Sequence, residues 1–184
     1  EVISHNADIQ IVKLLIDRGA NINAKNRNGE TPLHKIIAYN ADIQIVELLI
    51  DRDATINDGD KDGNTLLHIA AKIGNKQIIE LLLKNNADIT IKNNDENTPL
   101  HVLIDTLVPT EIITPIYLEE LSALLIETDS NSIKNKAGNT PLHIAINKHT
   151  MNIKNSLVSR IKLYIDTDVD VRGIQFDIKY NPIE

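Results

Sequence analysis

The stretch GETPLHKIIA, Gly29–Ala38, decides the fold, because its core, TPLH, recurs along the chain. The same four letters occupy residues 31–34, 98–101 and 140–143, and a near copy, TLLH, occupies residues 65–68. The four opening threonines are therefore 34, 33 and 42 residues apart. Recurrence near this spacing is typical of an array of structural repeats.

Each unit contains the signals for two short helices and a turn. Thr31 suits a helix N-cap and Pro32 suits the first helical position. Residues 40–42 interrupt the apolar pattern, which returns at helical spacing over residues 43–50, and residues 58–63, DGDKDG, have the turn chemistry of a tight hairpin. Helices this short are not stable alone in water, so the units must stack. The sequence therefore predicts an all-α solenoid of helix-turn-helix units joined by β-hairpin turns.

Other segments recur in step with TPLH. NADIQIVKLLIDRGANIN, residues 6–23, returns as NADIQIVELLIDRDATIN at 40–57 and more loosely as NKQIIELLLKNNADIT at 75–90. TPLH lies in register in the second, fourth and fifth units, and TLLH lies in the third. With these recurring motifs the chain resembles the ankyrin-repeat proteins over roughly residues 1–172. The expected divisions are a partial repeat at 1–25, repeats at 26–59, 60–92, 93–134 and 135–172, and a strand-like or capping segment at 173–184. The first repeat is expected to begin inside its first helix, as in a fragment of a longer array.

The recurring histidines, His34, His68, His101 and His143, could be metal ligands or general bases, or could hold the start of each helix. Stacked repeats would separate them by roughly 10 Å, whereas ligands lie about 2 Å from a shared metal. We therefore interpret them as structural, each bonding groups of its own helix start. The sequence also lacks a phosphate loop, G-x-S-x-G and H-E-x-x-H. We expect no enzyme activity, no catalytic residue and no cofactor.

The amino-acid composition excludes several further kinds of site and binding partner. The 184 residues include no cysteine, which excludes disulfides and thiolate sites and suits a reducing compartment, here the cytoplasm. A net charge of −7 argues against nucleic acid, and no apolar run approaches a membrane span. The start, EVISHNADIQ, has no signal-peptide pattern. Asp58, Asp60 and Asp62 alternate as in a calcium loop, but position 12 of that loop is Ile69 rather than glutamate, so no metal is expected.

Several positions depart from the repeat pattern. Gly19 closes a second helix, where the equivalent positions hold Asp53, Asn86 and Thr128. Glu96 stands where the other hairpins have glycine, and Leu66 replaces the motif proline. Each change is expected to lower local stability slightly. An apolar insertion near 106–120 either caps the solenoid core or forms a contact surface, and the sequence leaves both open.

The resemblance implies binding of a protein partner through hairpin tips and first helices, on a concave face. Carried over by position, the expected contact residues are Arg27, Asn28, Glu30, Tyr39, Lys61, Asp62, Asn64, Lys72, Ile73, Asn94, Asp95, Asn97, Lys136 and Asn139. The same positions also include Ala38, Asp105, Thr106, Ala137, Asn147 and Lys148. Tyr39 and Ile73, apolar on a polar face, are the expected anchor pair.

Three functions remain open at this point. The first is a non-catalytic protein-interaction module, a monomer that binds neither nucleic acid nor membrane. The second is the targeting or regulatory region of a longer enzyme or adaptor, and the third is a structural spacer. The abundance of Ile and Asn suggests an AT-rich genome. Similar arrays occur in intracellular bacteria and large DNA viruses, so a host-directed effector delivered into a host cell is a further expectation.

Overall fold

The computed structural model describes residues 2–39, 42–106 and 129–148. The insertion near 106–120, Thr128, most of the expected fifth repeat and the segment 173–184 fall outside them. The helices are α1 (Val2–Asp17), α2 (Pro32–Ala38), α3 (Ile43–Ile50), α4 (Leu66–Ile73), α5 (Lys76–Lys84) and α6 (Pro99–Thr106). A 3-10 helix, η1 (Asp129–Ser132), follows, and residues 141–148 are helical. The described residues contain helices and no strand, which confirms the all-α prediction.

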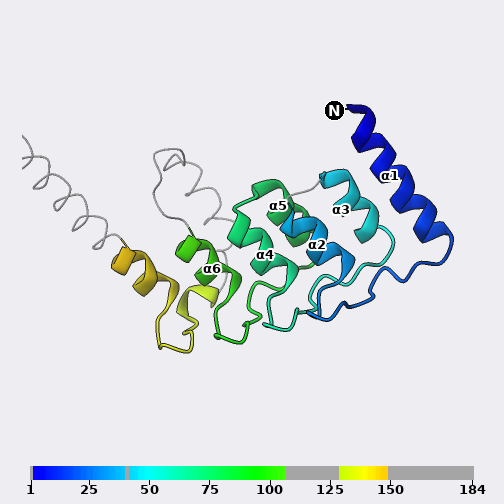
Figure 1. The fold of residues 1–184 in the computed structure, drawn as a ribbon. Helices are drawn as coiled ribbons and strands as arrows, with labels where there is room; N and C mark the ends of the chain where they lie inside the picture. Colours follow the sequence, from blue (N-terminus) through cyan, green and yellow to red (C-terminus); the bar gives the residue numbers. More distant parts are fainter. Residues whose placement is uncertain (1, 40–41, 107–128, 149–184) are drawn as a thin grey trace, which may run out of the picture. The chain divides into compact units, whose positions relative to one another are not determined.

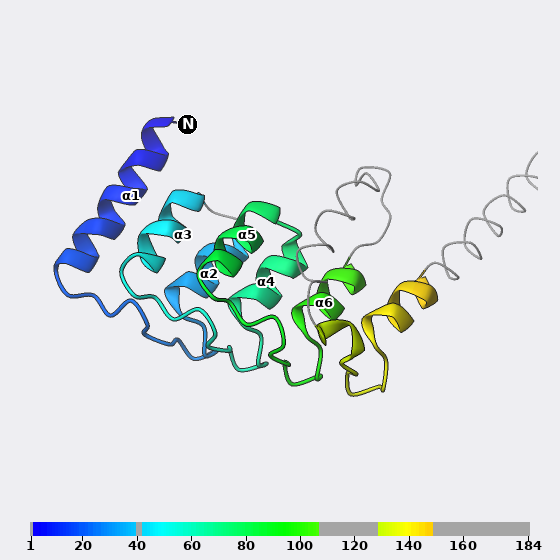
Figure 2. The ribbon, with the colours of Figure 1, turned by 180° about the vertical axis from the view of Figure 1, so that it is seen from behind.

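The helices of the compact unit Glu1–Lys148 stack in two rows. The first helices of successive repeats form one row, in which α4 contacts both α2 and α6. The second helices form the other row, in which α3 contacts both α1 and α5. Figures 1 and 2 show the long loops that join successive repeats gathered along one edge of both rows. Contacts of this kind, from each repeat to the next, define a solenoid.

The core lies between the two rows and consists of aliphatic side chains. Its largest fully buried apolar members are Leu33, Ile37, Leu66, Leu67, Ile78, Ile79, Leu82, Leu100 and Leu103. Burying one such side chain contributes about 1.5–3 kcal/mol. Alanine occupies the tighter positions 70 and 71, where α4 meets its neighbours. The apolar stripe predicted from helical spacing is therefore the surface that holds the repeats together.

Thr31 caps α2, as predicted. In α2, Thr31 Oγ1 accepts a hydrogen bond from the backbone N–H of His34, and His34 Nδ1 accepts from the backbone N–H of Thr31 at 3.2 Å. Thr65 and His68 make the corresponding Nδ1 bond at the start of α4. Leu66 in place of proline therefore does not prevent α4 from starting, and His68 Nδ1 still accepts from the Thr65 N–H.

Left-handed backbone occurs at the predicted exceptions to glycine. Asp53 and Asn86 have φ of 63°, like Gly19 with φ of 85°, and Glu96 has φ of 57°. Aspartate and asparagine adopt this conformation at modest cost, whereas it costs a residue like glutamate about 1–2 kcal/mol. The fourth unit thus carries local strain at its hairpin.

The first repeat differs from its expected form. It was expected to begin inside the first of two helices, yet α1 is one continuous helix from Val2 to Asp17. In the next repeat Asp42 instead caps α3, its carboxylate accepting from the Gln44 N–H at 2.9 Å. The same letters, NADIQIV, allow both outcomes, because Asn and Asp are only mildly unfavourable within a helix. In the second repeat α2 and α3 are separate helices that pack against each other.

Candidate functional site

Each hairpin loop is organised by the side chain of its first residue. Asp60 Oδ1 accepts from the backbone N–H groups of Asp62 and Asn64, at 2.9 and 2.8 Å. The amide oxygens of Asn26, Asn93 and Asn135 make the same pair of bonds in their own loops. Asp60, one carboxylate of the calcium-like sequence, is therefore a turn-forming residue. Among the described residues, no group of three His, Cys, Asp or Glu is arranged to hold a metal ion.

Backbone hydrogen bonds join the tip of each hairpin to the next. The N–H of Lys61 donates to the carbonyl of Asn28 at 2.9 Å, and the N–H of Asn94 donates to that of Asp62 at 2.9 Å. Between the last two described hairpins, Lys136 donates to Asp95 at 3.1 Å. Several of the expected contact residues are thus already bonded within the protein, and their backbones fix the spacing of the tips.

The motif histidines also join one repeat to the next. Nε2 of His68 lies 2.9 Å from the carbonyl oxygen of Asn97, and Nε2 of His101 lies 3.0 Å from that of Asn139. Because Nδ1 accepts a backbone N–H, Nε2 carries the proton and donates it to the carbonyl. Each of these two histidines does bond its own helix start, as predicted. The prediction that its bonds would all be local was wrong, because Nε2 bonds the following hairpin. Nε2 of His34 is buried without a hydrogen-bond partner.

Burial keeps these histidines neutral. Desolvation is the largest cause that lowers the pKa of His34, His68 and His101 from the ordinary 6.5. Carbonyl hydrogen bonds oppose it, those of Asn97 for His68 and Asn139 for His101. A neutral, fully buried imidazole whose Nδ1 is held by its own helix start is not placed to act as a general base or to bind a metal.

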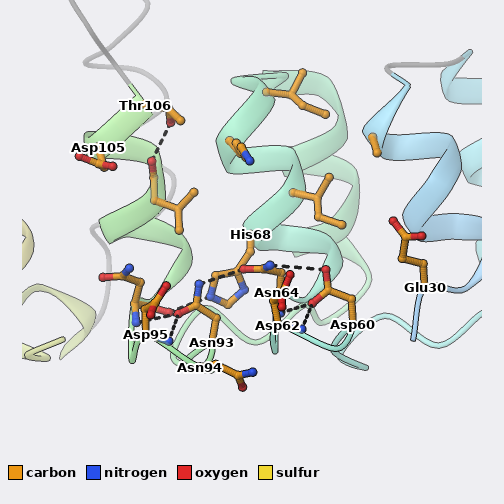
Figure 3. A pocket seen from close by; sticks show the side chains of 16 residues that line it. Glu30, Asp60, Asp62, Asn64, His68, Asn93, Asn94, Asp95, Asp105 and Thr106 are labelled. Atoms are coloured by element: carbon orange, nitrogen blue, oxygen red, sulfur yellow. Dashed lines mark hydrogen bonds between the residues drawn. The ribbon is translucent and has the colours of Figure 1, made fainter. Parts of the chain in front are cut away.

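A groove of about 810 Å³ lies between the first helices and the hairpin tips (Figure 3). It crosses three consecutive repeats, from Glu30 beside α2, past α4, to Asp105 on α6. Its lining residues are Glu30, Ala38, Asp60, Asp62, Asn64, His68, Ile69, Lys72, Ile73, Asn93, Asn94, Asp95, Asn97, Val102, Asp105 and Thr106. The groove is open to solvent, so a partner could enter without any rearrangement of the helices.

Many of the residues expected at a binding face lie in this groove. They are Glu30, Ala38, Asp62, Asn64, Lys72, Ile73, Asn94, Asp95, Asn97, Asp105 and Thr106. The other expected contacts do not line it: Arg27, Asn28, Tyr39, Lys61, Lys136, Ala137, Asn139, Asn147 and Lys148.

The expected anchor pair is divided between two environments. Ile73 lines the groove with 38% of its surface exposed. Tyr39 is 75% exposed outside the groove, with Nζ of Lys35 5.0 Å from its ring centroid. Of the expected anchor pair, Ile73 is therefore the member that lines the groove.

Other lining residues were missed by reasoning from the sequence. Asp60 and Asn93 begin their hairpins, while Ile69 and Val102 lie one helical turn inside α4 and α6. The repeat spacing of 33 residues relates each pair and is the signal that could have found them. Position in the repeat predicts the exposed tips more readily than the floor between them.

The groove is acidic. Five carboxylates and one lysine line it, which leaves a formal charge of −4 with His68 neutral. Glu30 is 3.6 Å from Nζ of Lys35, and Asp105 is 3.2 Å from Nζ of Lys148. The pKa of Glu30 is lowered, first by its hydrogen bond from Asn26. The surface therefore favours positively charged groups.

The comparisons with known proteins agree with this architecture. A family model described as ankyrin repeats (3 copies) matches residues 2–93 and, in an overlapping placement, residues 37–114. These matches together span more than half of the chain. A comparison with curated proteins finds no match. In the part of the chain that the structure describes, no helix is both long and apolar enough to cross a membrane. The repeat spacing, the capped first helices, the joined hairpins and the family match together show that the chain belongs to the ankyrin-repeat proteins, whose repeats are generally protein-interaction modules.

Proposed function

We propose that this chain is a non-catalytic module that binds a protein partner in the groove between its hairpin tips and first helices. The supporting observation is an open groove lined by three consecutive repeats, with polar walls and the partly exposed Ile73 among its lining residues. A rigid concave surface of this kind suits a macromolecular ligand more than a small one, because it does not enclose its occupant.

The rigidity of the groove supports this proposal. Its walls are fixed by bonds between repeats, such as Asn93 Nδ2 to Asn64 Oδ1 at 2.9 Å, and Asn94 Nδ2 to the Lys61 carbonyl at 3.0 Å. A surface held in place before binding loses little conformational entropy when a partner docks. The module would act as a monomer in the cytoplasm, and, in an organism that lives within host cells, as an effector that engages a host protein.

The test is an affinity capture from eukaryotic cell lysate with four versions of the protein. Wild type is compared with Ile73→Ala, with Tyr39→Ala, and with the control Ile11→Ala, which shortens an exposed isoleucine on α1 outside the groove. Binding through the groove predicts a partner that Ile73→Ala loses and Ile11→Ala retains. A partner lost only with Tyr39→Ala would place the contact outside the groove. Equal capture by all four proteins would contradict the proposal.

A further inference from the structure

The carboxylates of the groove are not equally available. Glu30 and Asp105 already have lysine partners on their own protein. Among the described residues, no lysine or arginine lies within ion-pairing distance of Asp60, Asp62 or Asp95. Asp60 Oδ1 accepts two backbone hydrogen bonds within its own hairpin, whereas the carboxylates of Asp62 and Asp95 accept none from the described residues. Two unpaired carboxylates therefore face the groove from successive hairpins.

The nearby lysines do not neutralise these two residues. Lys61 directs its Nζ to Asn28 Oδ1 at 3.2 Å, in the preceding hairpin, and does not line the groove. Lys72, on α4, is the one lysine among the lining residues. The excess negative charge is thus a property of the groove walls and is available to an incoming cation.

The floor beside these carboxylates is apolar. Ile69 and Ile73 of α4 and Val102 of α6 line the same groove as the two acidic hairpins. With three repeats at about 10 Å each, the groove spans on the order of 20–30 Å. An extended segment of about eight residues covers that length.

We propose that the occupant of this groove is an extended basic segment of another protein. It carries at least two Lys or Arg side chains, which pair with Asp62 and Asp95, and an aliphatic side chain that contacts Ile73. Charge complementarity of this kind selects the partner and speeds its association. This inference rests on the proposed function and adds to it the chemical class of the partner.

The experiment is a selection from a displayed library of random peptides of about twelve residues, a length that exceeds the groove. The bait is the full chain, as wild type, as Asp62→Ala/Asp95→Ala, and as the control Glu47→Ala/Asp51→Ala. The control removes the same number of charges from the exposed side of α3, so nonspecific attraction is matched. Alanine is the natural residue at the equivalent tip position, Ala137, and circular dichroism verifies that each variant is folded.

The proposal predicts enrichment of peptides that combine Lys or Arg with an aliphatic residue. Their affinity should fall about fivefold or more in the groove variant, should fall with added salt, and should not change in the control. A third variant, Asp62→Lys/Asp95→Lys, should instead select acidic peptides.

Two results would overturn the inference, and they are distinguishable. If the enriched peptides lack basic residues but lose affinity with Ile73→Ala, the groove is a binding site and only the basic partner is wrong. If no enriched peptide depends on Asp62, Asp95 or Ile73, both the basic partner and the proposed use of the groove are wrong.

Discussion

The imidazole of His68 joins two repeats, because its Nε2 lies 2.9 Å from the carbonyl oxygen of Asn97 in the following hairpin. Its Nδ1 accepts from the backbone N–H of Thr65 at 3.2 Å. One buried side chain thus fixes both the start of α4 and the distance to the next repeat. His68 therefore makes one hydrogen bond within its own repeat and one to the next repeat.

Replacing His68 with alanine is expected to lower the free energy of unfolding by about 2–4 kcal/mol, since it removes buried hydrogen bonds and leaves a cavity. The matched change is His143→Ala, at an exposed position where the ring contacts Thr140 Oγ1 at 2.7 Å. Here a loss of about 1 kcal/mol, the value of a helix cap, is expected. Urea unfolding of both variants measures the difference, and equal losses would contradict a bonding role between repeats.

Stability should fall in mild acid because of the buried histidines. Burial lowers the pKa of His34, His68 and His101 below 6.5, so the unfolded chain binds their protons more readily than the folded one does. Their contribution is complete above pH 6.5 and is lost as the pH falls from there towards the lowered values. Urea unfolding across this range should show the decline, and it should be shallower in His68→Gln. A flat profile between neutral pH and the onset of carboxylate titration would contradict it.

Glu96→Gly is expected to stabilise the protein by about 0.5–1 kcal/mol, because it relieves a φ of 57° at the cost of an exposed ion pair with Lys92. The opposite change, Gly63→Ala, is expected to destabilise by about 1–3 kcal/mol. Gly63 has φ of 77°, and a Cβ there would lie 2.8 Å from Asn94 Oδ1 and 3.0 Å from the Asn94 backbone nitrogen. Thermal unfolding of both variants tests the pair; a loss of stability in Glu96→Gly would show that the ion pair outweighs the strain.

Asn57 holds two backbone groups of the next repeat through its amide. Nδ2 donates to the carbonyl of Asn86 at 3.1 Å, and Oδ1 accepts from the N–H of Asp88 at 2.8 Å. Asn57→Asp keeps the acceptor but removes the donor and sets a charge beside the Asn86 carbonyl, so a loss of about 1–2 kcal/mol is expected. Asp51→Asn, which alters an exposed side chain at the end of α3, is the control. Urea unfolding should separate the two, and an unchanged Asn57→Asp would show that the amide bridge contributes nothing net.

The sequence predicted those features whose physics is local. Thr31 and His34 are three residues apart, so the cap of α2 could be inferred from spacing and side-chain chemistry alone. The left-handed positions of Asp53 and Asn86 followed in the same way from alignment with Gly19. The partner of His68 lies 29 residues away, and a sequence contains no distances from which such a bond could be measured.

The binding surface was predictable only in outline for the same reason. The repeat pattern placed Asp62 and Ile73 on one face, and both line the groove. It also placed Tyr39 there, because position in a repeat does not show where a side chain turns once its helix has ended. The acidity of the groove depends on which carboxylates lack a partner, and that requires the positions of Lys35, Lys61 and Lys148.

In the described part of the array, the backbone hydrogen bonds between hairpin tips run in one direction, from the N–H of the later unit to the carbonyl of the earlier one. Their donors, Lys61, Asn94 and Lys136, are exposed residues at loop tips, where an unbonded amide would exchange its proton with solvent rapidly. A bonded amide exchanges only when its contact opens. The exchange rate at each of these three residues therefore reports the separation of one particular pair of neighbouring units, so loosening of the array can be followed junction by junction in solution.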